Sequence, residues 1–100
     1  MEKNTPHCKL SIVKTLIKED KVRATASAFA GARALDILNL DQMCELVLSL
    51  SSANFYKSMT THANHRIWQD VYHAKTPNQD PIYLKLTVVD DVLIVSFKEL

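Results

Sequence analysis

Glycine is nearly absent from this chain of 100 residues, in which only Gly31 occurs. Walker A and Rossmann loops require several glycines at fixed spacing, because their backbone must approach phosphate closely. The chain contains neither motif. Cysteine is also scarce: Cys8 and Cys44 lie far apart and form no C-x-x-C pair. We therefore expect reduced thiols in a cytoplasmic protein rather than a disulfide framework.

Long apolar runs and a leader segment are missing as well. No stretch approaches the roughly 20 apolar residues that a membrane-spanning helix needs, and the N-terminus lacks the apolar segment of a signal peptide. We predict no membrane partner. Lys and Arg number 12 against 11 Asp and Glu, so overall charge identifies no partner. A hydrophobic content of 47% indicates one globular domain, residues 1–100.

The first half of the sequence has helical periodicity. Apolar residues recur at roughly helical spacing over residues 10–20, after a polar lead-in, and predict a first helix. A brief extended link or short edge strand is expected over Val22–Thr25. Ser27 is the candidate N-cap of a second helix, whose small residues around Gly31 favour close approach to a neighbour. A third helix is expected from about Leu40 to Leu50.

The second half alternates between apolar and polar residues, as strands do. We predict strands at Phe55–Thr61, Ile67–His73, Ile82–Val89 and Val92–Lys98, with turns or loops between them. On the apolar face of the last strand we expect Leu93, Val95 and Phe97. Helices followed by an antiparallel meander indicate an α+β fold, with the N-terminal helices packed on one face of an antiparallel sheet.

The other face of this sheet has a composition suited to RNA chemistry. If the strands pair in phase, it carries Lys57, Gln69, Tyr83, Lys85, Ser96 and Lys98. Lysines stabilise charge that develops on a phosphate, and a tyrosine or lysine with a shifted pKa moves protons. Gln and Tyr bind unpaired bases. RNA supplies its own nucleophile, the 2′-hydroxyl, so no metal is needed. A solvated sheet face has the same pattern.

Several strings resemble one protein family over nearly the whole chain. The short ones are Met1-Glu2-Lys3-x-Thr5-Pro6-His7, Lys21-Val22-Arg23-x-Thr25 and Met43-Cys44. The long ones are Phe55–Thr61, Ile67–Tyr72 and Val92–Glu99. They are similar to the MqsR toxins, the motility quorum-sensing regulators of bacterial type II toxin–antitoxin pairs. The turn His62–Arg66 departs from the family pattern, in which a tyrosine comes first and no arginine precedes Ile67.

The resemblance implies a RelE-like ribonuclease that cleaves mRNA at GCU-like triplets without a metal or other cofactor, and so stops translation. It also implies an antitoxin that has a zinc-binding N-terminal domain and a helix-turn-helix domain. The toxin is then expected to associate with operator DNA only indirectly, through this antitoxin. The family's proposed active-site residues correspond here to Lys57, Gln69 and Tyr83. The alternative is a RelE-like module that binds antitoxin or DNA without catalysis.

Five further residues are candidates for RNA binding. They are Tyr56, Met59, Lys85, Lys98 and His7. The lysines also suit a solubilising strand edge, a methionine in a strand is often core filler, and His7 suits a local cap as well as an acid or base. His62 and His65 have the spacing of a metal pair, but no third ligand lies near them in sequence, so we predict no metal site.

Overall fold

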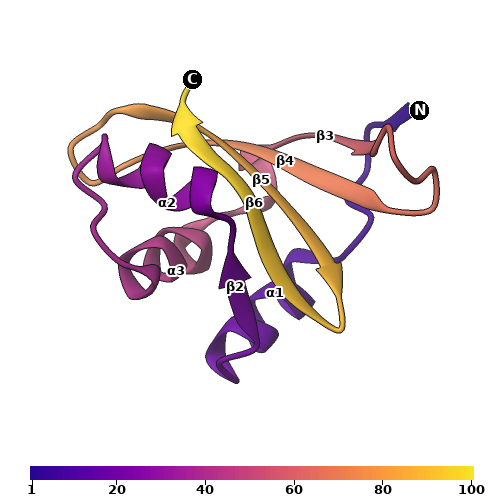
Figure 1. The fold of residues 1–100 in the computed structure, drawn as a ribbon. Helices are drawn as coiled ribbons and strands as arrows, with labels where there is room; N and C mark the ends of the chain where they lie inside the picture. The colour runs from indigo at the N-terminus through magenta and orange to yellow at the C-terminus, as the bar shows by residue number, and fades with distance from the viewer.

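The computed structural model describes residues 1–100 and has three α-helices, one short 3-10 helix and a six-stranded sheet (Figure 1). The helices are α1 (Leu10–Lys18), α2 (Ala26–Arg33), α3 (Leu40–Ser49) and the 3-10 turn η1 (Ser52–Asn54). The strands are β1 (Glu2–Lys3), β2 (Val22–Ala24), β3 (Phe55–Thr60), β4 (Trp68–Lys75), β5 (Pro81–Val89) and β6 (Asp91–Glu99). The predicted α+β class is confirmed.

The sheet has the strand order β1-β3-β4-β5-β6-β2 and is mostly antiparallel. The expectation of a purely antiparallel sheet is wrong at one edge, where β2 pairs with β6 in parallel. The chain runs through β2 between α1 and α2, and this passage takes it along β6 in the same direction. At the opposite edge β1, which lies in the segment described from the sequence only as a polar lead-in, pairs with β3. Strands of two or three residues are too short to show alternation.

One face of the sheet contributes to the apolar core, and we call it the core face. Tyr72, Leu84 and Phe97 lie side by side on β4, β5 and β6, and each is at most 1% exposed. They belong to one apolar cluster with residues from all three helices, among them Val13, Ile17, Ala28, Ala32, Met43 and Val47. In Figure 1, α2 lies against β6.

The opposite face, which we call the polar face, follows from the register. Lys57, Val71, Lys85 and Ser96 lie in one row across β3, β4, β5 and β6. Because side chains alternate along a strand, residues two positions away share that face. Val71 is fully buried even so. Lys57 and Lys85 flank Val71 in this row, and their aliphatic stems are long enough to cover an apolar side chain between them.

A β-bulge in β6 overturns the predicted apolar face of that strand. The register shifts between Lys85 and Leu86, so that Val95 is an extra residue on β6. The residues that face the core are Val92, Ile94 and Phe97, rather than Leu93, Val95 and Phe97. Ser96 remains on the polar face as predicted, because the alternation changes phase at the bulge.

Helix α2 packs closely on β6 at the one glycine of the chain. A Cβ added to Gly31 would lie 1.9 Å from the carbonyl oxygen of Phe97, so no other residue fits without a backbone shift. This confirms the close approach expected from the small residues. The predicted cap was wrong by two positions: Thr25, not Ser27, accepts the hydrogen bond from the Ala28 N–H. Thr25 also donates to the Val95 carbonyl, which ties the helix start to β6.

Candidate active site

The three residues that the resemblance assigns to the active site come from three adjacent strands. Lys57 lies on β3, Gln69 on β4 and Tyr83 on β5. Gln69 is two residues before Val71 and Tyr83 is two residues before Lys85, so all three share the polar face with Lys57. Residues that are far apart in sequence therefore form one surface.

A layer of aromatic rings and cations crosses this face at one end. The rings of Tyr56 and His73 are stacked, with centroids 4.1 Å apart and an interplanar angle of 18°. The His73 ring lies 6.1 Å from that of Tyr83 on its other side. The Nζ atom of Lys98 lies 5.1 Å from the Tyr83 centroid, within range of a cation–π interaction. A flat base can stack on such a surface.

The lysines of the polar face differ in their electrostatic surroundings. Lys57 Nζ donates to Glu2 Oε2 at 3.0 Å, and this hydrogen bond raises the pKa of Lys57. Burial lowers the pKa of Lys85, and the nearby charge of Lys98 lowers it further. Lys57 is therefore held as a cation, whereas Lys85 releases its proton more readily than an ordinary lysine does.

Gln69 lines a hollow on the polar face, four residues along β4 from His73. The hollow has a volume of about 380 Å³ and an apolar floor that includes Ile67, Leu93 and Val95. Arg23, on its rim, pairs with Asp91 at 3.0 Å. Half of the lining is apolar, and the rest includes two threonines, the Arg23–Asp91 pair and the Gln69 amide, which donates and accepts hydrogen bonds; a small ligand site combines such features.

The structure brings four of the five predicted RNA-binding residues to the polar face. Met59 lies opposite Gln69 in the register, while Tyr56, Lys85 and Lys98 belong to the rows described above. His7 is not among them. Its backbone N–H donates to the carboxylate of Asp70, and its ring stacks on Trp68 with centroids 5.5 Å apart.

Asp70, which holds this N-terminal segment, is on the core face. It is 2% exposed and accepts hydrogen bonds from the Ser58 hydroxyl at 2.6 Å, from the His7 N–H at 3.0 Å and from the Cys8 N–H at 3.1 Å. His7 therefore lies on the opposite side of the sheet from Lys57. Its contacts there, with Asp70 and Trp68, hold the N-terminal segment against the sheet.

Sequence reasoning missed His73 as a candidate. It was predicted as the last residue of its strand, before a loop, and received no role. A signal was present: His73 is four residues after Gln69 and so shares its face if the strand extends that far. The strand in fact runs to Lys75, and His73 lies directly opposite Tyr83.

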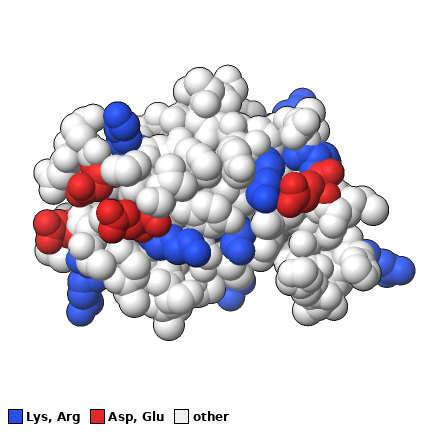
Figure 2. Space-filling view, turned by 90° about the horizontal axis from the view of Figure 1, so that it is seen from above, with Lys and Arg blue, Asp and Glu red and all other residues white.

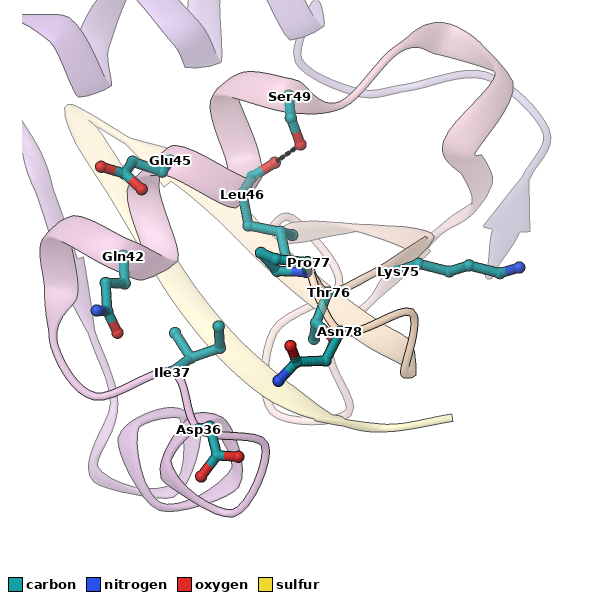
Figure 3. A pocket seen from close by; sticks show the side chains of 10 residues that line it. All are labelled: Asp36, Ile37, Gln42, Glu45, Leu46, Ser49, Lys75, Thr76, Pro77 and Asn78. Carbon is teal, nitrogen blue, oxygen red and sulfur yellow. Dashed lines mark hydrogen bonds between the residues drawn. The ribbon is translucent and has the colours of Figure 1, made fainter.

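A larger hollow, of about 540 Å³, lies elsewhere and contains none of the predicted site residues (Figure 3). It is lined by α3, the segment before it and the β4–β5 loop. Asp36 and Glu45 place carboxylates on its wall, and the Lys75 side chain extends away from it in Figure 3. Carboxylates repel a phosphate, so this hollow is poorly suited to a ligand that carries phosphate groups.

Charges on the surface are mixed rather than of one sign. Viewed from the side on which both termini lie, basic groups are scattered from one end of the surface to the other, and acidic groups lie towards its two ends (Figure 2). Both cysteines are free, and no three His, Cys, Asp or Glu side chains are clustered as metal ligands would be. None of the helices is long and apolar enough to cross a bilayer.

Fold and site together define a small α+β protein whose open sheet face carries lysines, stacked aromatic rings and an amide-lined hollow. The family described as motility quorum-sensing regulator, toxin of MqsA, matches residues 5–99. The chain is also similar to the mRNA interferase toxin MqsR of Escherichia coli K12, with 52% identity over 99 residues, which is 99% of each chain. The chain therefore belongs to the MqsR toxin family, and the resemblance noted in its sequence is confirmed.

Proposed function

We propose that this chain is the toxin of a type II toxin–antitoxin system, an endoribonuclease that cleaves mRNA and inhibits translation in the cytoplasm. The name of its Escherichia coli relative, an mRNA interferase toxin, supports this activity. The observation that supports it most strongly is the common face of Lys57, Gln69 and Tyr83, which are drawn from three strands. We further propose a RelE-like arrangement, in which the helices cover the core face and leave the polar face open to RNA.

The reaction we propose requires no metal, because the RNA 2′-hydroxyl is the nucleophile. Lys57 and Lys98 offset the negative charge that develops on the phosphate. Charges positioned in this way lower the free energy of the transition state substantially. Gln69 orients the substrate. Tyr83 hydrogen-bonds to the reacting groups. The raised pKa of Lys57 suits charge stabilisation better than proton transfer, because a lysine held as a cation is a poor proton acceptor.

Preference for a short motif, which we propose to be GCU-like, is assigned to the hollow beside Gln69. One base enters the hollow and meets the amide, while the exposed ring of Tyr56 and the side chain of Met59 hold neighbouring bases. Single-stranded RNA is read in this way, by stacking and by hydrogen bonds to base edges.

The partner we propose is a cognate antitoxin that has a zinc-binding N-terminal domain and a helix-turn-helix domain. The description of the family as the toxin of MqsA supports the existence of an antitoxin partner. The chain would meet operator DNA only through this antitoxin. An open reading frame next to its gene, encoding two C-x-x-C pairs followed by a helix-turn-helix, is the simplest observation that tests the pairing.

The activity is tested by treating RNA with the purified protein in the presence of EDTA and mapping the new 5′ ends. We expect ends that cluster at one short motif. RNA that is bound but uncut, both with EDTA and with added magnesium, would contradict catalysis and favour a binding module. Cleavage with magnesium alone would contradict only the metal-independent mechanism.

A further inference from the structure

His73 is the one imidazole on the polar face, and nothing described above assigns it a function. It lies on β4 between Tyr56 of β3 and Tyr83 of β5. The remaining histidines lie elsewhere: His7 is in the N-terminal segment that Asp70 holds, and His62 and His65 are in the β3–β4 loop. An imidazole, the side-chain group most often used as a general base, is therefore present on this face at one position only.

The surroundings of His73 leave its reactive atoms free for a substrate. Stacking on Tyr56 uses the face of the imidazole ring, with centroids 4.1 Å apart. The two nitrogens lie on the ring edge and are not covered by a stacked ring. The strand itself is held in place beside the ring, since the His73 carbonyl accepts a hydrogen bond from Asn54 Nδ2 at 3.1 Å. The backbone of His73 is thus held by Asn54 and the plane of its ring by Tyr56.

We propose that His73 is the general base of the cleavage, and this rests on the proposed ribonuclease function. A ring nitrogen takes the proton of the 2′-hydroxyl, and the 2′ oxygen forms a bond to phosphorus. The bond from phosphorus to the 5′ oxygen breaks, and that oxygen takes a proton from water. The imidazole returns its proton to solvent. The products carry a 2′,3′-cyclic phosphate and a 5′-hydroxyl.

The charged and titratable groups that face His73 agree with this role. They are Tyr56 and Lys57 on β3, Tyr83 and Lys85 on β5, Lys98 on β6, Lys75 on β4 itself and, through its ion pair with Lys57, Glu2 on β1. The four lysines place positive charge around the imidazole ring. The same cations attract the phosphate next to the reacting hydroxyl.

The test separates proton transfer from stacking. The variant His73→Phe keeps a flat ring beside Tyr56 but cannot accept a proton, and His65→Phe makes the same change at an exposed histidine of the β3–β4 loop. The rate kcat/KM for cleavage of an RNA oligonucleotide in EDTA is measured from pH 5 to 8. For wild type and His65→Phe we expect kcat/KM to rise with pH within the interval of about pH 5–8, as the base loses its proton.

For His73→Phe we expect kcat/KM to be about 100-fold lower than for wild type, as is typical for the loss of one general base. We also expect that kcat/KM of this variant does not rise with pH as it does for wild type. Added imidazole is expected to restore part of the activity of His73→Ala, because it replaces the missing base in the gap. A His73→Phe variant that keeps the wild-type rate and pH profile would overturn the proposal and leave His73 a stacking residue. Absence of cleavage by wild type would instead overturn the ribonuclease function itself.

Discussion

Gln69 and Asp70 are neighbours on β4, yet their side chains face opposite sides of the sheet and have different surroundings. Asp70 is buried and accepts three hydrogen bonds from groups of the protein. Gln69 lines a hollow that is open to solvent. Along the same strand, Tyr72 is buried in the core while His73 is stacked on the polar face. The period of two along a strand lets one element support stability on one face and chemistry on the other.

Substitutions on the two faces of the sheet should therefore have separable effects on cleavage and on stability. The largest is expected for the double variant Lys57→Ala/Tyr83→Phe. Cleavage is predicted to fall by about 1,000-fold, because both charge stabilisation and a hydrogen-bond donor are lost. The free energy of unfolding should change by less than about 1 kcal/mol, as for most surface substitutions. Initial cleavage rates in EDTA and urea denaturation measure the two quantities.

A matched control for this variant is Lys18→Ala, which removes an exposed lysine at the end of α1. It is expected to leave cleavage unchanged. If the double variant cleaved RNA and arrested growth like wild type, the assignment of the active site to the polar face would be wrong.

The second prediction concerns the core face. Asp70→Ala removes the acceptor of three hydrogen bonds, one from the buried Ser58 hydroxyl and two from part-buried backbone N–H groups. We expect the free energy of unfolding to fall by about 3 kcal/mol, since bonds to a charged group each contribute about 1.5–3 kcal/mol. Urea denaturation followed by Trp68 fluorescence measures this loss.

Ser58→Ala, which removes one of these donors, should cost about 1 kcal/mol. An Asp70→Ala variant as stable as wild type would show that the clamp on the N-terminal segment does not hold the fold.

The order of helices and strands was predictable because each long element has a clear period. The faces of β3, β4 and β5 followed in the same way, and they gave Lys57, Gln69 and Tyr83 a common surface. Alternation could not reveal the bulge at Val95, because an extra residue shifts the phase without leaving a mark in composition.

The parts of the site that were missed depend on contacts distant in sequence. The stack of Tyr56 on His73 requires the β3–β4 register, which includes a second irregularity between Phe55 and Lys57. The ion pair of Glu2 with Lys57 requires β1, a strand of two residues. No local pattern predicts either. His7 was predicted as a site candidate because the sequence does not reveal its hydrogen bond to Asp70. That bond places His7 on the other side of the sheet.

The third prediction concerns this ion pair. Glu2→Gln removes the carboxylate that competes with phosphate for Lys57. We expect RNA to bind a few-fold more tightly at low salt, with a salt dependence that is steeper by about one phosphate contact. Fluorescence anisotropy with a 2′-deoxy analogue that cannot be cut measures both. An unchanged salt dependence would mean that Lys57 does not contact phosphate.

The smallest effect is expected at Tyr72, the counterpart of Tyr83 on the core face. Its hydroxyl is buried without a hydrogen-bond partner, so Tyr72→Phe should change the free energy of unfolding by less than about 1 kcal/mol. Thermal or urea unfolding at neutral pH checks this value. Tyr72→Phe should also keep wild-type cleavage, whereas Tyr83→Phe should not.

The buried hydroxyl of Tyr72 also makes the free energy of unfolding depend on pH. Burial raises the pKa of Tyr72 from 10.0 to about 12, and the charge of Asp70 adds to the effect. In the unfolded chain the phenol loses its proton near its ordinary pKa of 10.0, so wild type loses stability as the pH rises from there towards about 12. Tyr72→Phe should lose less over this interval. An equal loss in both proteins would contradict the burial of this hydroxyl.

The central claim is that the polar face cleaves RNA by using the RNA's own 2′-hydroxyl. The most direct measurement compares two oligonucleotides in EDTA, one all-ribose and one with a single 2′-deoxy sugar on the 5′ side of the cleaved linkage. We predict that the ribose substrate gives a 2′,3′-cyclic phosphate and a 5′-hydroxyl, and that the deoxy substrate is not cut at that linkage. Cleavage of both at similar rates would contradict the claim.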